Sequence, residues 1–489
     1  MRLILNGHGY IYEIENTVRS FGIKISGILY DGTIKKTGSD SFCYSRLAKI
    51  SEKSLLLIAV KINGNIRIIK TSLPRDAEKK EIEFSFCEAI FGILAELTGF
   101  SPAWGLLTGV RPVKLMLAVR DEVGSFERAE ELLKTKYKVS TKKINLLSNV
   151  SRFAEGVSKR VDTMSYSLYI SIPFCPSRCS YCSFVSKEVE RDMGLLEAYI
   201  EKLIEEIRLS FKIADDIGLG LFSVYIGGGT PTVLSENLLD RLMEEISFSI
   251  PPDLAEFTVE AGRPDTLNRD KLKVLSRYPV NRIAINPQTM NDEVLKNIGR
   301  NHTVNDFLKA FTAAREIGFS NINSDVIAGL KGETLEGFER GLNRLIELKP
   351  QGITVHALTL KRGSQIREGS NIILNGEAAD MVSFATDRLE ESGYGPYYLY
   401  RQKGTVDGLE NTGYSLPGFE GIYNSCIMDE IHTIISCGAG GVTKLKEPYG
   451  RKIKRTFNYK YPVEYIDGFE EILKRKGFIK RFYEEAFQS

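Results

Sequence analysis

The 489-residue sequence predicts an α/β fold, in which a partial six-stranded (β/α) barrel lies between an N-terminal α/β domain and a C-terminal α+β extension. Two patterns support this prediction. From Ser165 to about Leu360, short strand-like segments alternate with segments of helical length, as they do in parallel βαβ units. The residues best able to do chemistry end or follow these strands, which is where barrels of this kind carry their active sites.

Residues 1–160 are predicted to form the separate N-terminal domain. Apolar and β-branched residues predict strands at Arg2–Asn6, Gly22–Tyr30 and Leu55–Thr71. The dipeptide Asn63-Gly64 favours a tight turn, so the last of these segments is expected to be a hairpin. Apolar residues at helical spacing predict helices at Asp76–Leu97, Glu127–Tyr137 and Thr141–Lys159.

The barrel is predicted to occupy residues 161–365, and residues 366–489 are expected to form a C-terminal domain that covers its rim and shapes a substrate site. The six barrel strands are predicted at Ser167–Ile172, Phe222–Ile226, Glu256–Glu260, Arg282–Ile285, Asn321–Ala328 and Ile353–Leu358. The helices between them are predicted at Leu195–Phe211, Ser235–Phe248, Thr266–Ser276, Val304–Ile317 and Thr334–Leu348. Such a barrel brings the loops after all six strands to one rim.

Three cysteines directly after the first barrel strand form the most specific motif. Cys175, Cys179 and Cys182 have the spacing C-x3-C-x2-C and are three of the seven cysteines in the chain. A structural zinc site needs four ligands, and no fourth Cys or His lies nearby in the sequence. Three thiolates suit a 4Fe–4S cluster with one open iron, the arrangement with which radical SAM enzymes bind S-adenosylmethionine (SAM). Zinc and buried thiols remain the alternatives.

The loops after the later strands carry groups that suit SAM. The run Gly227–Thr232 lacks the Gly-Lys-Ser/Thr ending of a nucleotide-binding loop, and its glycines are expected to bring the backbone close to the SAM amino group. Glu260 ends the third strand, Asp325 lies in the fifth, and His356 lies near the end of the sixth. Carboxylates at the rim suit a sulfonium, an ammonium and ribose hydroxyls, whereas Arg300 is expected to pair with a carboxylate.

Aromatic and cationic residues beyond the barrel predict the kind of substrate. The stretch Tyr394–Lys403 is rich in tyrosine and contains Arg401, and Lys361 and Arg362 follow the sixth strand. Aromatic faces favour flat rings, and arginine favours carboxylates, so a flat substrate with several carboxylates is expected.

Composition limits the partners. A net charge of +2 gives no general attraction to nucleic acid or to membranes. No apolar run approaches the roughly 20 residues that span a bilayer, and the N-terminus lacks the apolar core of a signal peptide. The sequence therefore predicts a cytoplasmic protein without membrane insertion, in a compartment where thiols stay reduced.

The segment Leu168–Cys182, together with Gly227–Thr232, resembles the oxygen-independent coproporphyrinogen III oxidase (dehydrogenase) family of radical SAM enzymes. The likeness extends from about Tyr166 to Tyr400 and is weaker as far as Val442. It is greatest for the long form of the family, which has an extra N-terminal domain. The resemblance implies a radical SAM barrel that converts two propionates of coproporphyrinogen III to vinyls, giving protoporphyrinogen IX. It also implies a reductant protein such as flavodoxin or ferredoxin.

The resemblance implies a role for each residue that matches a family motif. The cluster ligands, which also carry the catalysis, would be Cys175, Cys179 and Cys182. Contacts to SAM are implied for Tyr169, Tyr181, Gly228, Gly229, Thr230, Glu260, Gln288, Arg300 and Asp325.

Two departures from the family pattern keep alternatives open. Phe184 stands where short oxidases often have a fourth cysteine, and phenylalanine there is also typical of the related haem chaperones. The chaperones are expected to carry a His-Asn-x-x-Tyr-Trp motif, but this chain has Glu410–Ser415, without the His and the Trp. His302 and His432 remain candidate haem ligands. A haem carrier and another radical SAM reaction on haem are therefore alternative functions.

Overall fold

The computed structural model describes residues 1–30, 41–184, 186–189, 193–359, 377–402, 405, 408–450 and 452–488. They form two compact units, Met1–Ser148 and Asn149–Ser489. Helix α5 (Thr141–Arg160) contains the border between the two units, which falls between Ser148 and Asn149. This border lies twelve residues before the one predicted from the sequence at 160/161. The predicted border at 365/366 lies inside the second unit.

The first unit contains a five-stranded sheet with the order β2-β1-β3-β4-β5. Its strands are β1 (Arg2–Asn6), β2 (Gly27–Tyr30), β3 (Phe42–Ile50), β4 (Lys53–Ile62) and β5 (Asn65–Pro74). Its helices are α1 (Ile11–Ser20), α2 (Lys79–Thr98), α3 (Pro112–Val123) and α4 (Phe126–Thr135). The predicted hairpin is confirmed, because Ile62 pairs with Asn65 across a turn in which Asn63 and Gly64 both have positive φ. Strand β3 and helices α1 and α3 were not predicted from the sequence.

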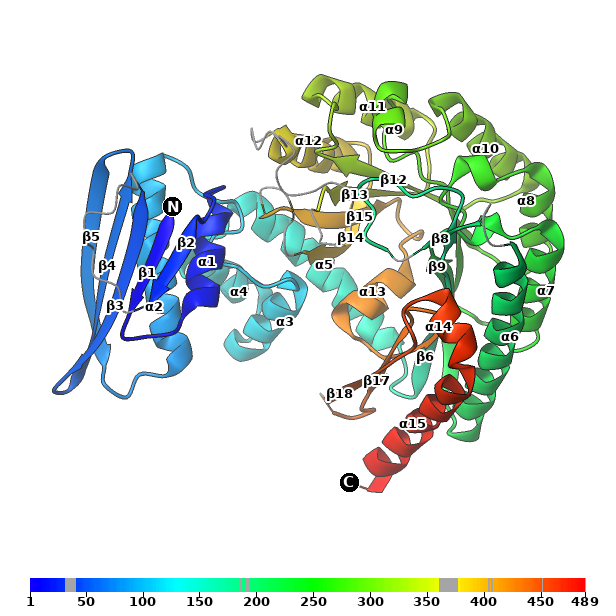
Figure 1. The fold of residues 1–489 in the computed structure, drawn as a ribbon, viewed down its shortest axis with the longest axis horizontal. Helices are drawn as coiled ribbons and strands as arrows, with labels where there is room; N and C mark the ends of the chain where they lie inside the picture. Colours follow the sequence, from blue (N-terminus) through cyan, green and yellow to red (C-terminus); the bar gives the residue numbers. More distant parts are fainter. Residues whose placement is uncertain are drawn as a thin grey trace. The chain divides into compact units, whose positions relative to one another are not determined.

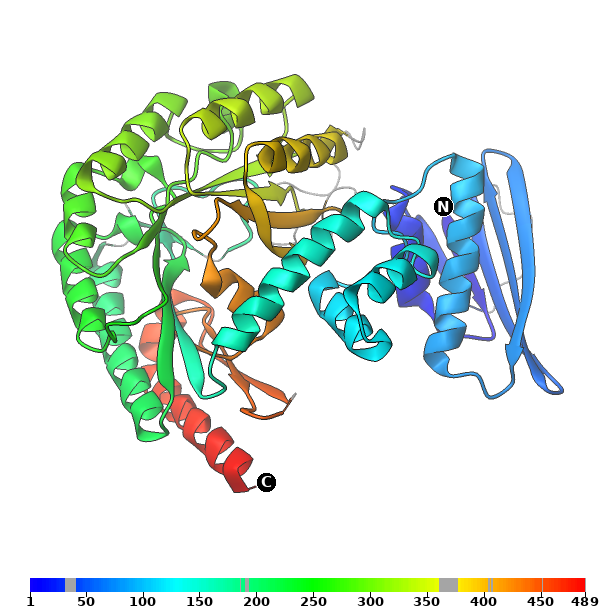
Figure 2. The same ribbon diagram turned by 180° about the vertical axis from the view of Figure 1, so that it is seen from behind.

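The second unit contains the six predicted parallel strands in chain order, within an eleven-stranded sheet (Figure 1). These strands are β6 (Ser165–Ile172), β9 (Gly220–Gly228), β10 (Glu256–Glu260), β11 (Arg282–Ala284), β12 (Ile322–Ala328) and β13 (Gly352–Ala357). Helices α6 (Met193–Asp216), α7 (Glu236–Ser247), α8 (Arg269–Ser276), α10 (Val304–Ile317) and α11 (Leu335–Glu347) form an arc outside the strands, as both views show (Figures 1 and 2). The partial α/β barrel is thus confirmed. The short helix α9 (Asp292–Asn297) was not predicted.

The C-terminal residues extend the barrel sheet at both of its edges. On the β13 side lie β15 (Glu410–Ser415) and β14 (Gly395–Arg401), whereas β16 (Thr433–Cys437), β17 (Val442–Lys446) and β18 (Ile453–Phe457) lie on the β6 side. An open sheet leaves unpaired N–H and C=O groups at its edge strands, and β15 and β16 pair with these groups of the barrel. The remaining elements are α12 (Glu377–Glu391), α13 (Ile422–Asp429), α14 (Pro462–Asp467), α15 (Phe469–Gln488), and the short pair β7 (Phe174–Cys175) and β8 (Lys187–Glu188).

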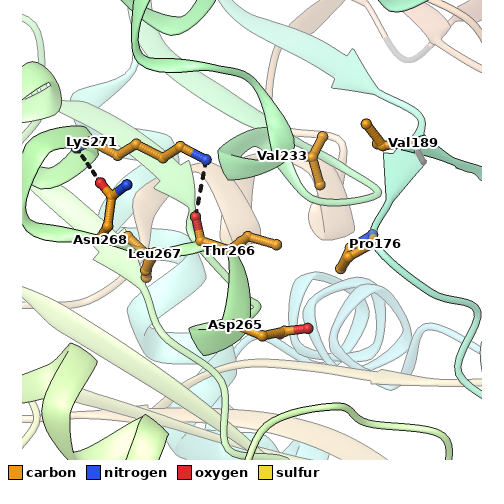
Figure 3. A pocket seen from close by; sticks show the side chains of 8 residues that line it. All are labelled: Pro176, Val189, Val233, Asp265, Thr266, Leu267, Asn268 and Lys271. Carbon is orange, nitrogen blue, oxygen red and sulfur yellow. Dashed lines mark hydrogen bonds between the residues drawn. The ribbon is translucent and has the colours of Figure 1, made fainter. Parts of the chain in front are cut away.

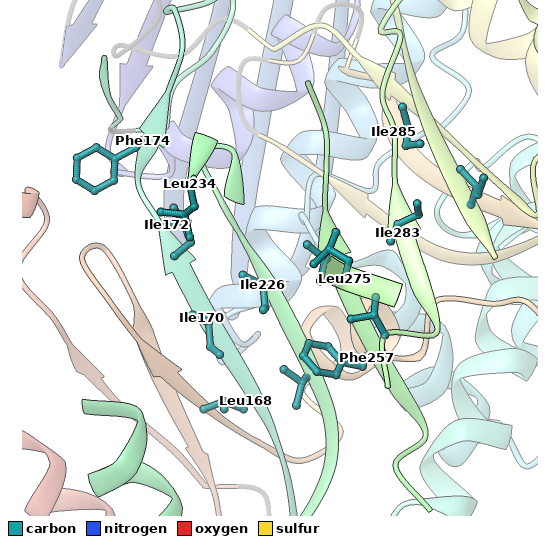
Figure 4. Packing of buried hydrophobic residues seen from close by; sticks show 14 of the residues in the cluster. Leu168, Ile170, Ile172, Phe174, Ile226, Leu234, Phe257, Leu275, Ile283 and Ile285 are labelled. Carbon is teal, nitrogen blue, oxygen red and sulfur yellow. The ribbon is translucent and has the colours of Figure 1, made fainter. Parts of the chain in front are cut away.

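The two faces of the parallel strands differ in polarity. Apolar residues such as Leu168, Ile170 and Ile172 of β6 and Ile226 of β9 are fully buried in the main hydrophobic core (Figure 4). Each such side chain contributes about 1.5–3 kcal/mol relative to exposure. Alternate residues point to the opposite, inner face. This inner face is polar: Ser167, Tyr169, Ser171, Ser223, Tyr225, Glu256, Thr258, Glu260, Arg282, Asn323, Asp325, Thr354 and His356. An interior lined in this way is suited to a polar ligand rather than to an apolar core.

No helix in the part of the chain that the structure describes is both long and apolar enough to cross a membrane.

Candidate functional site

The three cysteines of the predicted motif lie in the loop that follows β6. Cys179 is buried, whereas Cys175 and Cys182 are half-buried, and all three are free thiols. The loop is fixed by its backbone: Cys182 donates to the Cys179 carbonyl (3.1 Å), and Ser180 donates to the carbonyl of Ile298 (3.0 Å). Burial raises the pKa of Cys175 and of Cys182. A bound metal reverses this preference, because it deprotonates the thiol that ligates it.

The surroundings of the thiols fit an anionic iron–sulfur cluster. The buried guanidinium of Arg263 donates through Nη1 to the sulfur of Cys179 (3.3 Å). A second buried guanidinium, that of Arg300, interacts electrostatically with Cys179 and Cys182. Within the described residues, no three His, Cys, Asp or Glu side chains are gathered as ligands of a single ion. The three thiols and the two guanidinium groups beside them are the groups that would hold a cluster with net negative charge.

The glycine run packs directly against the cysteine loop. Gly229 donates to the carbonyl of Ile172 (2.8 Å), and Thr230 donates to the carbonyl of Phe174 (2.8 Å). The hydroxyl of Thr230 lies 3.5 Å from the sulfur of Cys175. A Cβ atom on Gly229 would lie 2.4 Å from the Phe174 carbonyl oxygen, so no larger residue fits there. Close approach to the cysteine loop is thus one physical reason for this glycine, beside the approach to SAM that the sequence analysis expected.

We expect Gly229→Ala to lower cluster uptake and to cost about 1–3 kcal/mol of stability, because the added methyl group must push aside the backbone of Ile172 and Phe174, which leads into the cysteine loop. Gly220→Ala is the matched control, since Gly220 begins the strand β9 that Gly229 directly follows, and a Cβ atom there meets nothing within 4 Å. Iron content after anaerobic reconstitution and the urea midpoint measure the two effects. Equal iron content in the two variants would contradict the expected coupling between the glycine run and the cysteine loop.

Glu260 lies beside the glycine run on the inner face. The hydroxyl of Tyr225 donates to its carboxyl group (2.5 Å), and the Gly228 backbone donates to it as well. A Cβ atom on Gly227 would lie 2.9 Å from Oε2 of Glu260. Burial raises the pKa of Glu260 to about 7. Near neutral pH this carboxyl group therefore sits close to its titration point, and a cationic ligand beside it would favour the charged form.

The pKa of Asp325 shifts in the opposite direction from that of Glu260. Its carboxylate accepts hydrogen bonds from the amides of Asn286 and Asn323, both at 2.8 Å, and lies 3.6 Å from Nε2 of His356. Burial opposes the charged form, but His356 and the hydrogen bonds from Asn323 and Thr354 together lower the pKa of Asp325. Burial lowers the pKa of His356, but Asp325, Asn411 and Glu260 together raise it above its ordinary value. The inner face thus places an ion pair next to a carboxyl group that titrates near neutrality.

The raised pKa of Glu260 predicts a pH dependence of stability. A carboxyl group whose folded pKa is about 7 and whose ordinary value is 4.5 contributes stability that is fully present below pH 4.5 and is lost as the pH rises through 7. We expect Glu260→Gln to remove about 2–3 kcal/mol of the fall in unfolding free energy between pH 5 and pH 8. Glu201→Gln, at an exposed position, should leave the fall unchanged. Parallel pH profiles for the protein and the Glu260→Gln variant would refute the expectation.

Three stacked tyrosines lie beside Glu260, and two of them were not predicted. The ring of Tyr225 lies 4.4 Å from that of Tyr423 and 6.2 Å from that of Tyr169, with interplanar angles of 22° and 24°. Tyr423 comes from α13 and is buried, and among the described residues its hydroxyl has no hydrogen-bond partner. Tyr225 lies opposite Tyr169 on the neighbouring strand, so the alternation of side chains along the strands could have placed it on the inner face. No local sequence pattern indicated that Tyr423 would join them. A buried, unpartnered hydroxyl next to this face is suited to a ligand.

The remaining predicted residues lie at two places around the cysteine loop. Arg300 donates to the hydroxyl of Tyr181 (2.9 Å) and to the carbonyl of Gly262 (3.2 Å), and its Nε has no partner within the described residues. Gln288 has a positive φ of 66° and is tied by its backbone to β12, where it bridges Val326. The structure thus brings Tyr181 and Arg300 together beside the cysteines, whereas Gln288 donates its backbone N–H to the carbonyl of Asp325 (2.9 Å).

Of the cationic residues predicted to bind the substrate, Arg401 lies within the described residues. Lys361, Arg362 and Lys403 lie outside the described residues. The guanidinium of Arg401 donates to the carbonyl of Gly408 at 3.1 and 2.8 Å, and burial lowers its pKa to about 10. A contact between Arg401 and a substrate carboxylate stays a prediction.

The two candidate haem-ligating histidines are buried. His432 is held between the hydroxyls of Ser165 (3.2 Å) and Ser167 (2.7 Å), and burial lowers its pKa to about 3. His302 is 3% exposed and lies behind the cysteine loop, where its Nδ1 is 3.8 Å from Asp265. Neither ring faces solvent, so neither is placed to bind a haem at the surface.

Comparisons with known proteins find radical SAM relatives of this chain. The radical SAM superfamily matches residues 169–345. The oxygen-independent coproporphyrinogen-III oxidase-like protein HemZ of Bacillus subtilis is 36% identical over 415 residues, which cover 83% of each chain. The heme chaperone HemW of Lactococcus lactis is 36% identical over 282 residues, which cover 56% of this chain and 69% of that protein. A solved structure, the coproporphyrinogen III oxidase HemN of Escherichia coli, matches 66% of this chain and 72% of its own at 21% identity, with a TM-score of 0.49.

Proposed function

Because the chain belongs to the radical SAM superfamily and, within it, to the family of HemZ, the oxygen-independent coproporphyrinogen-III oxidase-like protein, we propose that it is a radical SAM enzyme that acts on a tetrapyrrole. Its reaction is the oxidative decarboxylation of two propionates of coproporphyrinogen III to vinyls, which gives protoporphyrinogen IX. A reductant such as flavodoxin or ferredoxin supplies electrons, and the cytoplasm, where thiols stay reduced, is the expected location.

The observation that carries the proposal is the position of the three thiols, next to two buried arginines and at the carboxyl end of a strand whose inner face is polar. In this proposal Cys175, Cys179 and Cys182 ligate the 4Fe–4S cluster. When bound and reduced, the cluster supplies the electron that cleaves SAM to a 5′-deoxyadenosyl radical, and the protein orients the reactants and excludes water.

Charged side chains and aromatic rings of this chain would bind different parts of SAM. Glu260, beside Gly227 and Gly228, offers a carboxylate to the cationic end of the molecule, and its pKa near 7 lets it lose its proton when a cation binds. Arg300, with its unpartnered buried Nε, offers a donor to a carboxylate. The stacked rings of Tyr169, Tyr225 and Tyr423 offer a flat apolar surface with one free hydroxyl. Together these groups match the ammonium, the carboxylate and the flat base of one ligand.

The deciding experiment is anaerobic turnover of coproporphyrinogen III by the reconstituted protein with SAM and a reductant, followed by product analysis. The proposal expects protoporphyrinogen IX, together with methionine and 5′-deoxyadenosine. Cleavage of SAM with coproporphyrinogen left unchanged would refute the substrate and retain the radical SAM chemistry. A reconstituted protein that binds no iron would refute both.

A haem carrier is the second candidate, because chaperones of the HemW type in two bacteria match more than half of this chain at 36% and 30% identity. It predicts stoichiometric haem binding that survives gel filtration, without turnover of coproporphyrinogen. The absence of retained haem would remove this candidate.

A further inference from the structure

Arg263 is a buried cation that the proposed roles leave unexplained. It follows β10 by three residues and is 3% exposed. Its guanidinium binds Asp265 through Nε (3.0 Å) and Nη2 (2.8 Å), which leaves Nη1 to donate to the sulfur of Cys179 at 3.3 Å. The same guanidinium donates to the hydroxyl of Ser177 at 3.0 Å. Arg263 therefore holds the cysteine loop at two residues and presents a fixed positive charge to one thiol.

Asp265 does not cancel this charge at the sulfur. The two Asp265 oxygens occupy the edge of the guanidinium that faces away from Nη1, and the Asp265 side chain is 18% exposed, against 3% for Arg263. Asp265 also lines a pocket of about 300 Å³, together with Pro176 and Val189 (Figure 3). Water in this pocket screens the carboxylate more than it screens the buried cation. Of these two opposing charges, the guanidinium is the one in contact with Cys179 and the one less exposed to water.

We infer that Arg263 raises the reduction potential of the 4Fe–4S cluster and holds the Cys179 side of its loop in place. The inference rests on the proposed function, since it takes Cys179 as a cluster ligand. Reduction adds one electron from an external one-electron donor, with no bond made or broken in the protein. A buried guanidinium, which stays charged in proteins, stabilises the more negative reduced state, and a hydrogen bond to a ligand sulfur acts in the same direction. Arg263 is thus a positioning and tuning residue, not a group that reacts.

The test is a spectroscopic redox titration of the anaerobically reconstituted full chain, with iron and sulfide content measured in the same samples. For Arg263→Gln we expect full loading and a midpoint potential that is more negative by about 59 mV, which is a tenfold fall in the one-electron equilibrium constant. For Asp265→Asn, which keeps an acceptor for Arg263 but removes the opposing charge, we expect a shift to less negative potential. Arg277→Gln is the control, because Arg277 pairs with Asp240 at the surface, and its potential should equal that of the unsubstituted protein.

The outcomes separate this inference from the proposed function. A loaded Arg263→Gln protein with an unchanged potential would overturn the inference and leave the proposed function standing. If the Arg263→Gln protein does not load, the Asp265→Asn protein decides, and an unchanged or more negative potential there would overturn the inference. An unsubstituted chain without any cluster would overturn both. Opposite shifts in the two variants would support the inference, since a merely structural role moves no potential.

Discussion

Cys179→Ala is expected to lose the iron–sulfur cluster and, with it, all reductive cleavage of SAM. Cys179 is the most buried of the three thiols, and it is the one that receives the hydrogen bond from Arg263. Without its thiolate, only Cys175 and Cys182 of the three-cysteine motif remain to ligate iron. Iron content, brown colour after anaerobic reconstitution and 5′-deoxyadenosine release measure the loss.

Cys426→Ala is the matched control for this experiment. Cys426 is fully buried in a different hydrophobic cluster, between α5 and α13, so its replacement should cost some stability and leave the iron content unchanged. A Cys179→Ala protein that kept its full iron content would mean that the motif does not hold the cluster. Loss of iron in both variants would point instead to a general loss of folding.

Lys476→Met is expected to destabilise the second unit by about 3–5 kcal/mol, because it breaks a buried ion pair on one side only. Lys476 is 2% exposed, and its Nζ lies 3.0 Å from the carboxylate of the fully buried Glu206. The same ammonium donates to the carbonyl of Ser436 (2.6 Å). This contact ties α6 and α15 to β16, the C-terminal strand that pairs with β6. The methionine would leave the charge of Glu206 without its cation.

Urea unfolding followed by circular dichroism measures this effect, and Lys474→Met is the control. Lys474 lies two residues earlier on the same helix and is exposed, so the control should change the unfolding free energy by less than about 0.5 kcal/mol. Equal midpoints for the two variants would show that the buried pair does not stabilise the fold. A low iron content in the Lys476→Met variant alone would in addition link the C-terminal strands to the cysteine loop.

Local sequence patterns were sufficient to predict the parallel strands and the position of the cysteine motif after the first of them. The predicted strands match β6 and β9 to β13 within two residues, and the predicted helix at Val304–Ile317 is the observed α10. Alternation and helical spacing are properties of a short segment, so they can be read without knowing what that segment packs against. The motif around Cys175, Cys179 and Cys182 is local for the same reason.

The residues that were missed depend on pairings between distant parts of the chain. Arg263 lies 84 positions from Cys179, and Tyr423 lies almost 200 positions from the Tyr225 ring that it stacks on. The five C-terminal strands were read as irregular because two of them complete the edges of a sheet formed earlier in the chain. Their own composition is mixed, so only the unpaired edges of the barrel explain why they are strands.

By itself, the sequence determined that three thiols follow the first strand of a parallel α/β array, because spacing and periodicity are fixed by the chain alone. Tertiary structure decided the environment of those thiols. It placed Arg263 against Cys179, packed Gly229 against the loop, and raised the pKa of Glu260 to about 7 by burial. These properties depend on distance, exclusion of water and close contact between segments that are far apart in the sequence. No single segment determines them, because each arises only when the segments pack together.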